Sequence, residues 1–279
     1  MSGMKQIKIF REPGRLQKWC RARKLAGAKI ALVPTMGYLH DGHLSLIRAA
    51  RRRGADEIVV SVFVNPVQFG PNEDYEKYPR DEKSDLEKCR EAGATAVFFP
   101  TPQNMYLDRH SVYVEEDDLS RGLCGARRPG HFRGVCTVVA KLFNLAHPDF
   151  AVFGQKDYQQ AQVIKRMVRD LNFDLKIVVA PIVREKSGLA RSSRNTYLSP
   201  DEREKAVAIS RALLSFGAKD GVKTLAALRK SLEKAGLKVD YVECVDAETL
   251  EPRRRPERGC CILVAAYCGR TRLIDNRVL

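Results

Sequence analysis

The stretch Ile30-Ala31-Leu32-Val33-Pro34-Thr35-Met36-Gly37-Tyr38-Leu39-His40-Asp41-Gly42-His43 joins an apolar run to a pair of histidines. The apolar run predicts a buried strand, and Leu44, Ile47 and Ala50 recur after the pair at helical spacing. The histidines therefore lie at a strand-to-helix junction. Backbone N–H groups of a first helical turn lack partners within the helix, and the helix dipole adds partial positive charge. Such a junction favours an anion such as phosphate.

The histidine pair has two other interpretations. A single histidine near a helix start is more often a cap or a surface residue, but here two of the five histidines flank Gly42, which lets a ligand approach closely. Imidazole pairs also bind zinc, yet no cysteine or further histidine lies nearby in the sequence to complete a tetrahedral set. Phosphate binding is therefore favoured over metal binding.

Composition indicates an ordinary globular protein of one large or two moderate domains. The 279 residues are 44% hydrophobic and 30% charged. No apolar run is long enough to cross a bilayer, and the start Met1–Gln6 lacks the apolar core of a secretion signal. We therefore expect a cytoplasmic protein that does not bind membranes.

Eight cysteines show no Cys-x-x-Cys spacing, and several lie in apolar surroundings, as Cys136 does before Thr137. We expect them to be reduced and buried. Lys and Arg outnumber Asp and Glu by 49 to 34, which gives a net charge of +15. Because the basic residues are dispersed and no aromatic-basic pattern appears, we expect attraction of anionic substrates and no specific nucleic-acid binding. An RNA-binding protein without enzymatic activity remains the alternative that the charge suggests.

Apolar, β-rich segments alternate with amphipathic ones through the first two thirds of the chain. The expected strands are Ile30–Val33, Ile58–Val64, Thr95–Phe99, Ala151–Phe153 and Lys176–Val183, with helical stretches such as Arg80–Ala92 and Tyr158–Leu171 between them. This alternation predicts an α/β fold with a Rossmann-like parallel sheet, which binds ligands at the carboxyl ends of its strands.

The pattern changes after Arg184. Ser199-Pro200-Asp201-Glu202 is a helix start, and two helical stretches near 200–216 and 221–235 precede three strands near 239–245, 261–267 and 271–275. We therefore expect a catalytic domain over residues 1–184 and a smaller C-terminal α+β domain over residues 185–279.

Four further segments carry groups suited to phosphate or a small polar substrate. Each also has a plain structural interpretation, as a capped helix, a turn or an interdomain loop. The cations and hydroxyls suit phosphate oxygens, and the amides suit a substrate with hydroxyl and methyl groups. The segments are Gly154–Gln160, Ser192–Asn195, Arg127–Gly134 and Asn65–Gly70.

Taken together, these segments closely resemble the pantothenate synthetase family, within the wider nucleotidyltransferase group that has a His-x-Gly-His turn. The resemblance spans most of the chain in family order. One departure is Ser187, where the family more often has an acidic residue; Arg191 is one of several residues accepted before Ser-Ser-Arg-Asn. The matching stretches are Pro34–Leu46, Phe63–Phe69, Arg128–Val139, Phe153–Gln160, Val183–Asn195 and, more weakly, Val239–Asp246 and Leu273–Asn276.

The resemblance implies an ATP-dependent ligase that joins pantoate to β-alanine through a pantoyl-adenylate. It implies catalytic roles for His43, His40, Lys156 and Arg194 and pantoate or β-alanine binding by Gln68 and Gln160. It also implies Mg²⁺ with the triphosphate, a homodimer, and a C-terminal domain that acts as a lid. An aminoacyl-tRNA synthetase would share the histidine turn, but no anticodon-binding module is evident. The implied ATP-binding residues are Met36, Gly37, Tyr38, Leu39, His40, Asp41, Gly42, His43, Gly154, Gln155, Lys156, Asp157, Val183, Arg191, Ser192, Ser193 and Arg194.

Overall fold

A computed structural model describes residues 6–71, 73–217, 221 and 223–279. The expectation about a secretion signal rests largely on residues 1–5, which lie outside this range. The chain forms two compact units: residues 1–154 with 163–180, and residues 155–162 with 181–279. The domain boundary at residue 184 stays a prediction. The two divisions differ chiefly in segment 155–162, which the sequence places in the first domain.

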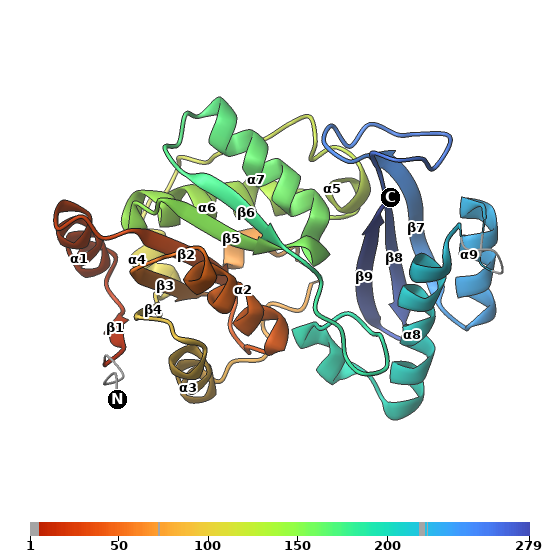
Figure 1. Ribbon diagram of the computed structural model, residues 1–279, viewed down its shortest axis with the longest axis horizontal. Helices are drawn as coiled ribbons and strands as arrows, with labels where there is room; N and C mark the ends of the chain where they lie inside the picture. The colour runs from red at the N-terminus through yellow and green to blue at the C-terminus, as the bar shows by residue number, and fades with distance from the viewer. Residues whose placement is uncertain (1–5, 72, 218–220, 222) are drawn as a thin grey trace. The chain divides into compact units, whose positions relative to one another are not determined.

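The first unit contains a six-stranded sheet in which every pair of neighbours is parallel (Figure 1). This confirms the predicted α/β class. Its strands lie in the order β1-β4-β3-β2-β5-β6. Their bounds are β1 Lys8–Phe10, β2 Ile30–Thr35, β3 Glu57–Val62, β4 Ala96–Phe98, β5 Phe150–Gly154 and β6 Lys176–Ala180.

Helices cover both faces of this sheet. Ala31 and Val33 of β2 pack in one buried cluster with Ile47 of α2 (Asp41–Arg52). Because side chains alternate along a strand, Ile30 and Leu32 point to the other face. There α1 (Pro13–Leu25) and α6 (His131–Ala146) contact β2 and each other. The remaining helical elements that begin in this unit are η1 Pro66–Gln68, α3 Glu82–Ala92, α4 Pro102–Met105 and α5 Leu123–Arg127.

The strand order reverses beside β2. From β2 the chain proceeds through β3 to β4 in one direction, then returns to place β5 on the other side of β2. Ligands in open α/β sheets bind at such a switch point, outside the carboxyl ends of the strands. The histidine turn follows β2, and Gly154 ends β5. The topology therefore places both segments at the ends of neighbouring strands.

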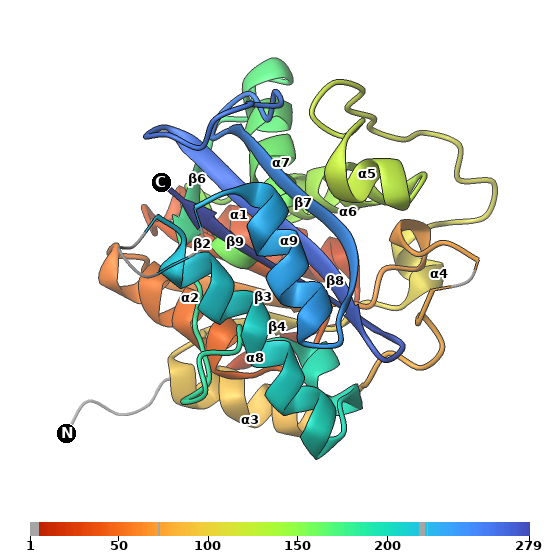
Figure 2. The ribbon, with the colours of Figure 1, turned by 90° about the vertical axis from the view of Figure 1, so that its right-hand side faces the viewer.

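The second unit contains an antiparallel sheet in the order β7-β8-β9, with α8 and α9 packed against it (Figure 2). Helix α8 begins as predicted, because Ser199 Oγ accepts the Glu202 N–H at 3.2 Å and Pro200 occupies the first turn. The bounds are η2 Gln155–Asp157, η3 Ser193–Tyr197, α8 Pro200–Ser215, α9 Leu225–Lys234, β7 Lys238–Asp246, β8 Cys260–Cys268 and β9 Thr271–Val278; α7 Tyr158–Asp170 begins in this unit and ends in the first.

Several details differ from the sequence expectations; strand β3, for example, ends at Val62 rather than Val64. The sequence indicated neither β1 nor α1, since β1 has only three residues and α1 buries only Leu16 and Cys20. Helix α6 begins at His131, so the segment Arg127–Gly134 runs into the helix rather than ending before it. Strand β6 ends at Ala180, so Val183 lies in the connection that follows it.

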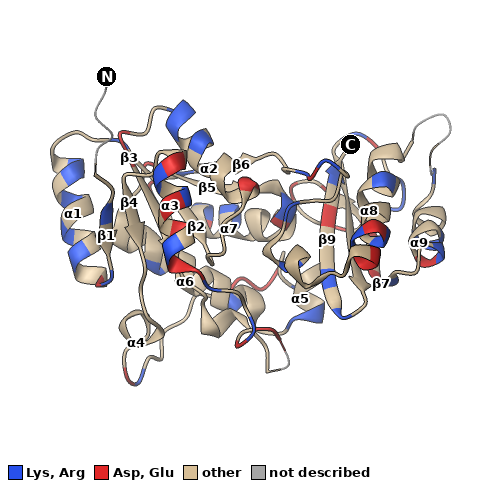
Figure 3. Cartoon of the chain, turned by 90° about the horizontal axis from the view of Figure 1, so that it is seen from below, with Lys and Arg blue, Asp and Glu red and all other residues tan. Residues whose placement is uncertain are grey.

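Charge and cysteine usage follow the predicted pattern. Basic segments are spread over several elements and alternate with acidic ones in α3 and α8 (Figure 3). All eight cysteines are free and buried, as expected. Within the described ranges, no helix has both the length and the apolar character needed to cross a membrane.

Candidate functional site

The two histidines cap α2 with their side chains. His40 Nδ1 accepts the Gly42 N–H at 3.2 Å, and His43 Nδ1 accepts the His40 N–H at 3.3 Å. A ring nitrogen that accepts a backbone N–H carries no proton, so each neutral imidazole carries its hydrogen on Nε2. The rings stack with centroids 4.0 Å apart. The pair is thus both a helix cap and a set of two Nε2–H donors on stacked rings.

The turn that leads into the histidines is held from two sides. Thr35 Oγ1 donates to the Ser61 carbonyl at 2.7 Å and accepts the Gly37 N–H at 3.3 Å. On the other side, Asp85 of α3 accepts the N–H groups of Tyr38 and Leu39. Asp85 has no sequence signal of this role, because nothing in the local pattern connects it to a turn 46 residues away.

Gln68 is buried at the end of η1, and its side-chain amide is oriented by its neighbours. Asn65 Nδ2 donates to Gln68 Oε1 at 3.1 Å, and Gln68 Nε2 lies 3.1 Å from Met36 Sδ. Tyr106 in turn donates its hydroxyl hydrogen to Asn65 Oδ1 at 2.7 Å. Burial raises the pKa of Tyr106. The Tyr106 hydroxyl therefore remains a neutral donor, and the structure brings two predicted site residues, Met36 and Gln68, together.

The basic segment Arg127–Gly134 contributes a partly buried ion pair. Arg128 binds both carboxylate oxygens of Glu73, at 2.7 and 2.6 Å. Burial by itself raises the pKa of Glu73, but the hydrogen bonds and charge of Arg128 outweigh it and hold that pKa below its ordinary value. Arg128 is thus committed to Glu73, and it also contacts His131 at 3.0 Å.

In the second unit, Asn276 holds the turn that carries Lys156. Its Nδ2 donates to the carbonyls of Gln155 and Lys156 at 2.9 and 3.0 Å, and its Oδ1 accepts Gln155 Nε2 at 3.1 Å. Lys156 Nζ lies 3.5 Å from Asp157 Oδ1, and its side chain is 21% exposed. Gly154, the last residue of β5 before this turn, has open space beside its Cα, because a Cβ there would meet no atom within 4 Å. The weak resemblance over Leu273–Asn276 was the one sequence signal for Asn276.

The segment that carries Arg194 is tied together by ion pairs. Arg184 binds Asp275 of β9 through two hydrogen bonds of 2.6 and 3.0 Å. Glu185 accepts from Asn195 at 3.0 Å and from Arg203 at 2.8 Å. Burial alone raises the pKa of Glu185, but these two partners hold it below its ordinary value.

Hydrogen bonds also hold the backbone around the predicted ATP-binding residues of this segment. Arg191 donates its N–H to the Val183 carbonyl at 2.9 Å, and Ser192 Oγ accepts the Arg194 N–H at 3.3 Å, so that Ser192 caps η3. Turns η2 and η3 both contact β9. The structure therefore brings the Lys156 and Arg194 turns onto one strand. Gln160, on α7, belongs to this unit, whereas Gln68 belongs to the first.

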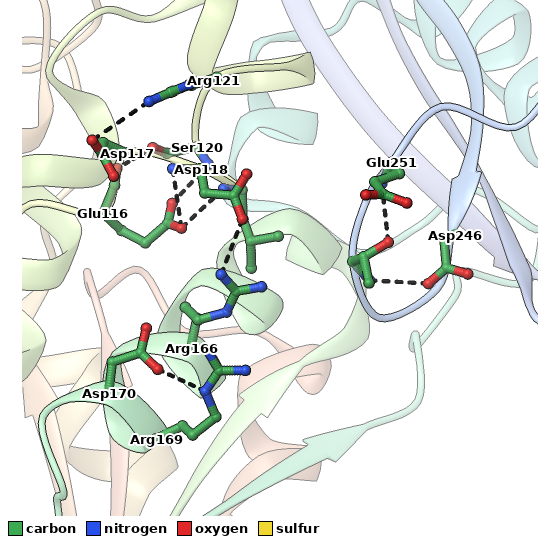
Figure 4. Close-up of polar contacts among 12 residues, drawn as sticks. Glu116, Asp117, Asp118, Ser120, Arg121, Arg166, Arg169, Asp170, Asp246 and Glu251 are labelled. Atoms are coloured by element: carbon green, nitrogen blue, oxygen red, sulfur yellow. Dashed lines mark hydrogen bonds and ion pairs between the residues drawn. The ribbon is translucent and has the colours of Figure 1, made fainter.

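The described part of the chain contains no group of three His, Cys, Asp or Glu side chains arranged to hold a metal. In the acidic run 115–118, for example, the carboxylates of Glu116 and Asp118 are bound to other protein groups. Glu116 turns back to accept the backbone N–H groups of residues 118 to 120, and Asp118 pairs with Arg166 at 3.0 Å (Figure 4). We therefore assign no protein ligands to a metal.

Comparison with known proteins settles the family. The family model described as pantoate-beta-alanine ligase matches residues 8–278. The chain belongs to this family. As a member, it is an enzyme, a ligase of pantoate and β-alanine, as the sequence resemblance implied.

Sequence relatives and solved structures both match nearly the whole chain. The pantothenate synthetase of Myxococcus xanthus (strain DK1622) is 54% identical over 273 residues, which are 95% of this chain and 93% of that protein. The crystal structure of pantothenate synthetase from Thermus thermophilus superposes with a TM-score of 0.87 at 42% sequence identity. The match covers 97% of this chain and 99% of the Thermus thermophilus chain. The pantoate-beta-alanine ligase from Francisella tularensis, crystallised with beta-gamma ATP and beta-alanine, has a TM-score of 0.85 at 34% identity and covers 98% of both chains.

Proposed function

We propose that this ligase works in two steps on one pantoate. In the first, a pantoate carboxylate oxygen bonds to the α-phosphorus of ATP, and the bond from that phosphorus to pyrophosphate breaks. In the second, the amine of β-alanine attacks the carbonyl carbon of the adenylate, AMP leaves with the bonding electron pair, and the amine loses a proton. The products are pyrophosphate, AMP and pantothenate. The relative that was crystallised with beta-gamma ATP and beta-alanine supports ATP as the cosubstrate.

The observation that carries the proposal is the orientation of the two imidazoles. Since both Nδ1 atoms accept backbone N–H groups, His40 and His43 present Nε2–H donors at the end of a strand that flanks the switch point. A carboxylate is already ionised at neutral pH, so its attack needs positioning and charge neutralisation rather than a base. We assign the principal donor role at the reacting phosphates to His43 and an assisting role to His40.

The second unit supplies cations for the same chemistry. Lys156 and Arg194 lie on turns that both contact β9, and we propose that they neutralise charge as pyrophosphate departs. The proposed ATP-binding set is the one that the resemblance implied: Met36, Gly37, Tyr38, Leu39, His40, Asp41, Gly42, His43, Gly154, Gln155, Lys156, Asp157, Val183, Arg191, Ser192, Ser193 and Arg194.

We propose that Gln68 and Gln160 bind pantoate. Gln68 is the better supported of the two, because Asn65 already orients its amide. Amide groups suit a substrate with hydroxyls, since they offer both a donor and an acceptor.

Four further expectations remain proposals. Mg²⁺ enters as part of the ATP complex, held by the phosphates, and we derive no step through it. The chain forms a homodimer, and residues 185–279 act as a lid. The enzyme works in the cytoplasm, which the eight free cysteines favour because a reducing compartment keeps thiols free.

The test is substrate-dependent product formation by the purified enzyme. Pantothenate and AMP should form in equal amounts from ATP, pantoate and β-alanine, and His43→Ala should slow adenylate formation by roughly 10²–10³, the usual effect of losing one donor to a developing charge. Wild-type single-turnover rates in a folded His43→Ala variant would overturn the assignment. AMP release with another acid in preference to pantoate would contradict the proposed substrate.

A further inference from the structure

We propose that Asp85, assisted by Lys88, is a positioning residue for this reaction: it fixes the backbone of the turn that delivers His40 and His43. Asp85 lies on α3 and is 1% exposed, so it does not present itself to a ligand. The proposal rests on the proposed role of the two histidines. It adds a residue that acts on them from behind the turn.

The contacts with Asp85 and Lys88 hold three backbone polar groups of the turn. Asp85 Oδ2 accepts the Tyr38 N–H at 2.8 Å, and Oδ1 accepts the Leu39 N–H at 2.6 Å. Lys88, one turn further along α3, donates from Nζ to the Leu39 carbonyl at 2.8 Å. Leu39 is thus bound at both ends of its backbone by side chains of one helix, immediately before His40.

The turn needs such support because its backbone is strained. Gly37 has φ +86° and Tyr38 has φ +51°, so two successive residues adopt the left-handed region. For a residue with a Cβ, as at Tyr38, this region costs about 1–2 kcal/mol and persists only where the surroundings enforce it. A Cβ at Gly37 would lie 2.9 Å from Val62 Cγ1 and 3.0 Å from Asp85 Oδ2. The space behind the turn is therefore already filled by Asp85.

Burial opposes a negative charge on Asp85. Burial raises its pKa above the ordinary value, although the two backbone N–H groups and Lys88 act in the opposite direction. A buried carboxylate that served packing alone would be replaceable by an apolar side chain. Here both carboxylate oxygens are needed, because they accept from the N–H groups of two adjacent residues, and the N–H group of Leu39 is buried.

The consequence for the reaction is geometric. His40 follows Leu39 directly, and its own N–H is the group that orients the His43 ring. A shift of the Leu39 backbone therefore moves both Nε2–H donors together. Displacing catalytic groups by about 1 Å costs up to roughly 10²-fold in rate.

The substitution Asp85→Asn tests this, because it keeps the size of the side chain and removes one of the two acceptors. We expect single-turnover adenylate formation to fall by about 10-fold or more, with the pantoate KM nearly unchanged. In a double-mutant cycle, Asp85→Asn should add little to the defect of His43→Ala, since it acts through that residue. Lys88→Met should also slow adenylate formation, but by a smaller factor than Asp85→Asn.

Asp149→Asn is the matched control. Asp149 Oδ2 accepts the Ile30 N–H at 2.7 Å, so it pins the opposite end of the same strand, β2. This variant should lose stability and keep its rate. An Asp85→Asn variant that forms the adenylate at the wild-type rate would overturn the proposal. So would a double variant whose loss in rate equals the product of the losses of Asp85→Asn and His43→Ala. If Asp85→Asn does not fold, Lys88→Met at the wild-type rate would overturn it instead. A fully active His43→Ala would contradict the proposed function itself, before the positioning role is reached.

Discussion

His131 Nδ1 lies 2.9 Å from the backbone carbonyl of Gln68, and this contact determines which ring nitrogen of His131 carries the hydrogen. A carbonyl only accepts, so Nδ1 carries the hydrogen, and Arg128 then donates to an unprotonated Nε2 at 3.0 Å. A neutral histidine thus links the partly buried Glu73–Arg128 pair to the backbone of the proposed pantoate-binding residue Gln68. The N-terminal turn of α6 sets the position of η1.

Gly134 of α6 should control pantoate binding, because its backbone packs directly against the backbone of Val67 and Gln68 in η1. A Cβ at position 134 would lie 2.6 Å from Gln68 Cα and 2.5 Å from the Val67 oxygen, and backbone atoms cannot yield as a flexible side chain does. Gly134→Ala should therefore push η1 away and raise the pantoate KM by about 10-fold or more. Steady-state kinetics with varied pantoate measures this.

Gly122→Ala is the control for that change. It lies in the same unit, has φ −95°, and a Cβ there would meet no atom within 4 Å. Its pantoate KM should match that of the wild type. Gly134→Ala with an unchanged KM would show that η1 does not determine pantoate affinity.

Lys156→Ala and Arg194→Ala should each reduce kcat far more than they affect the pantoate KM. Both cations are proposed to act on charge that grows between the ground state and the transition state, and such interactions appear in kcat, with losses of about 10²–10³. Lys165→Ala, which removes an exposed lysine of α7, provides the control and should be silent. A raised KM with unchanged kcat in either variant would assign that cation to substrate binding instead.

The Glu73–Arg128 pair should make stability depend on pH at the acid end. The pKa of Glu73 is held below its ordinary value, so the pair stabilises the fold above about pH 4.3, the unfolded value, and loses that contribution as pH falls through the folded pKa. Wild type should therefore exceed Glu73→Gln in unfolding free energy at pH 7, by about 1 kcal/mol, and the gap should close in acid.

Urea unfolding of both proteins at a series of pH values measures this gap. Glu82→Gln serves as the comparison, because Glu82 pairs with Arg11 on the surface, where both side chains are about half exposed. Its difference from wild type should be small at every pH. A gap for Glu73→Gln that stays constant with pH would show that the charge of Glu73 does not contribute.

The parts of the fold that the sequence predicted are those with local signals. The apolar run of β2, the histidine pair and the Ser199 cap are each visible within a few residues, and the structure confirms them. Asp85 and Asn276 had no comparable signal, because they hold groups 46 and 121 residues away, and such pairings arise only when the chain folds. Edge strand β1 is too short to show alternation.

The order of the two steps gives the most discriminating prediction. Pyrophosphate exchange into ATP should require Mg²⁺, ATP and pantoate but not β-alanine, because the proposed first step consumes only ATP and pantoate. The proposed phosphate-binding groups lie at the end of β2 and on turns that contact β9, and we assign all of them to one nucleotide. The same groups must therefore first activate the carboxylate and then hold the adenylate until the amine arrives. That mixed anhydride is reactive toward water, so its survival requires that water be excluded. Exchange that appears only after β-alanine is added would contradict an adenylate formed in advance, and it would favour a reaction in which both substrates act together.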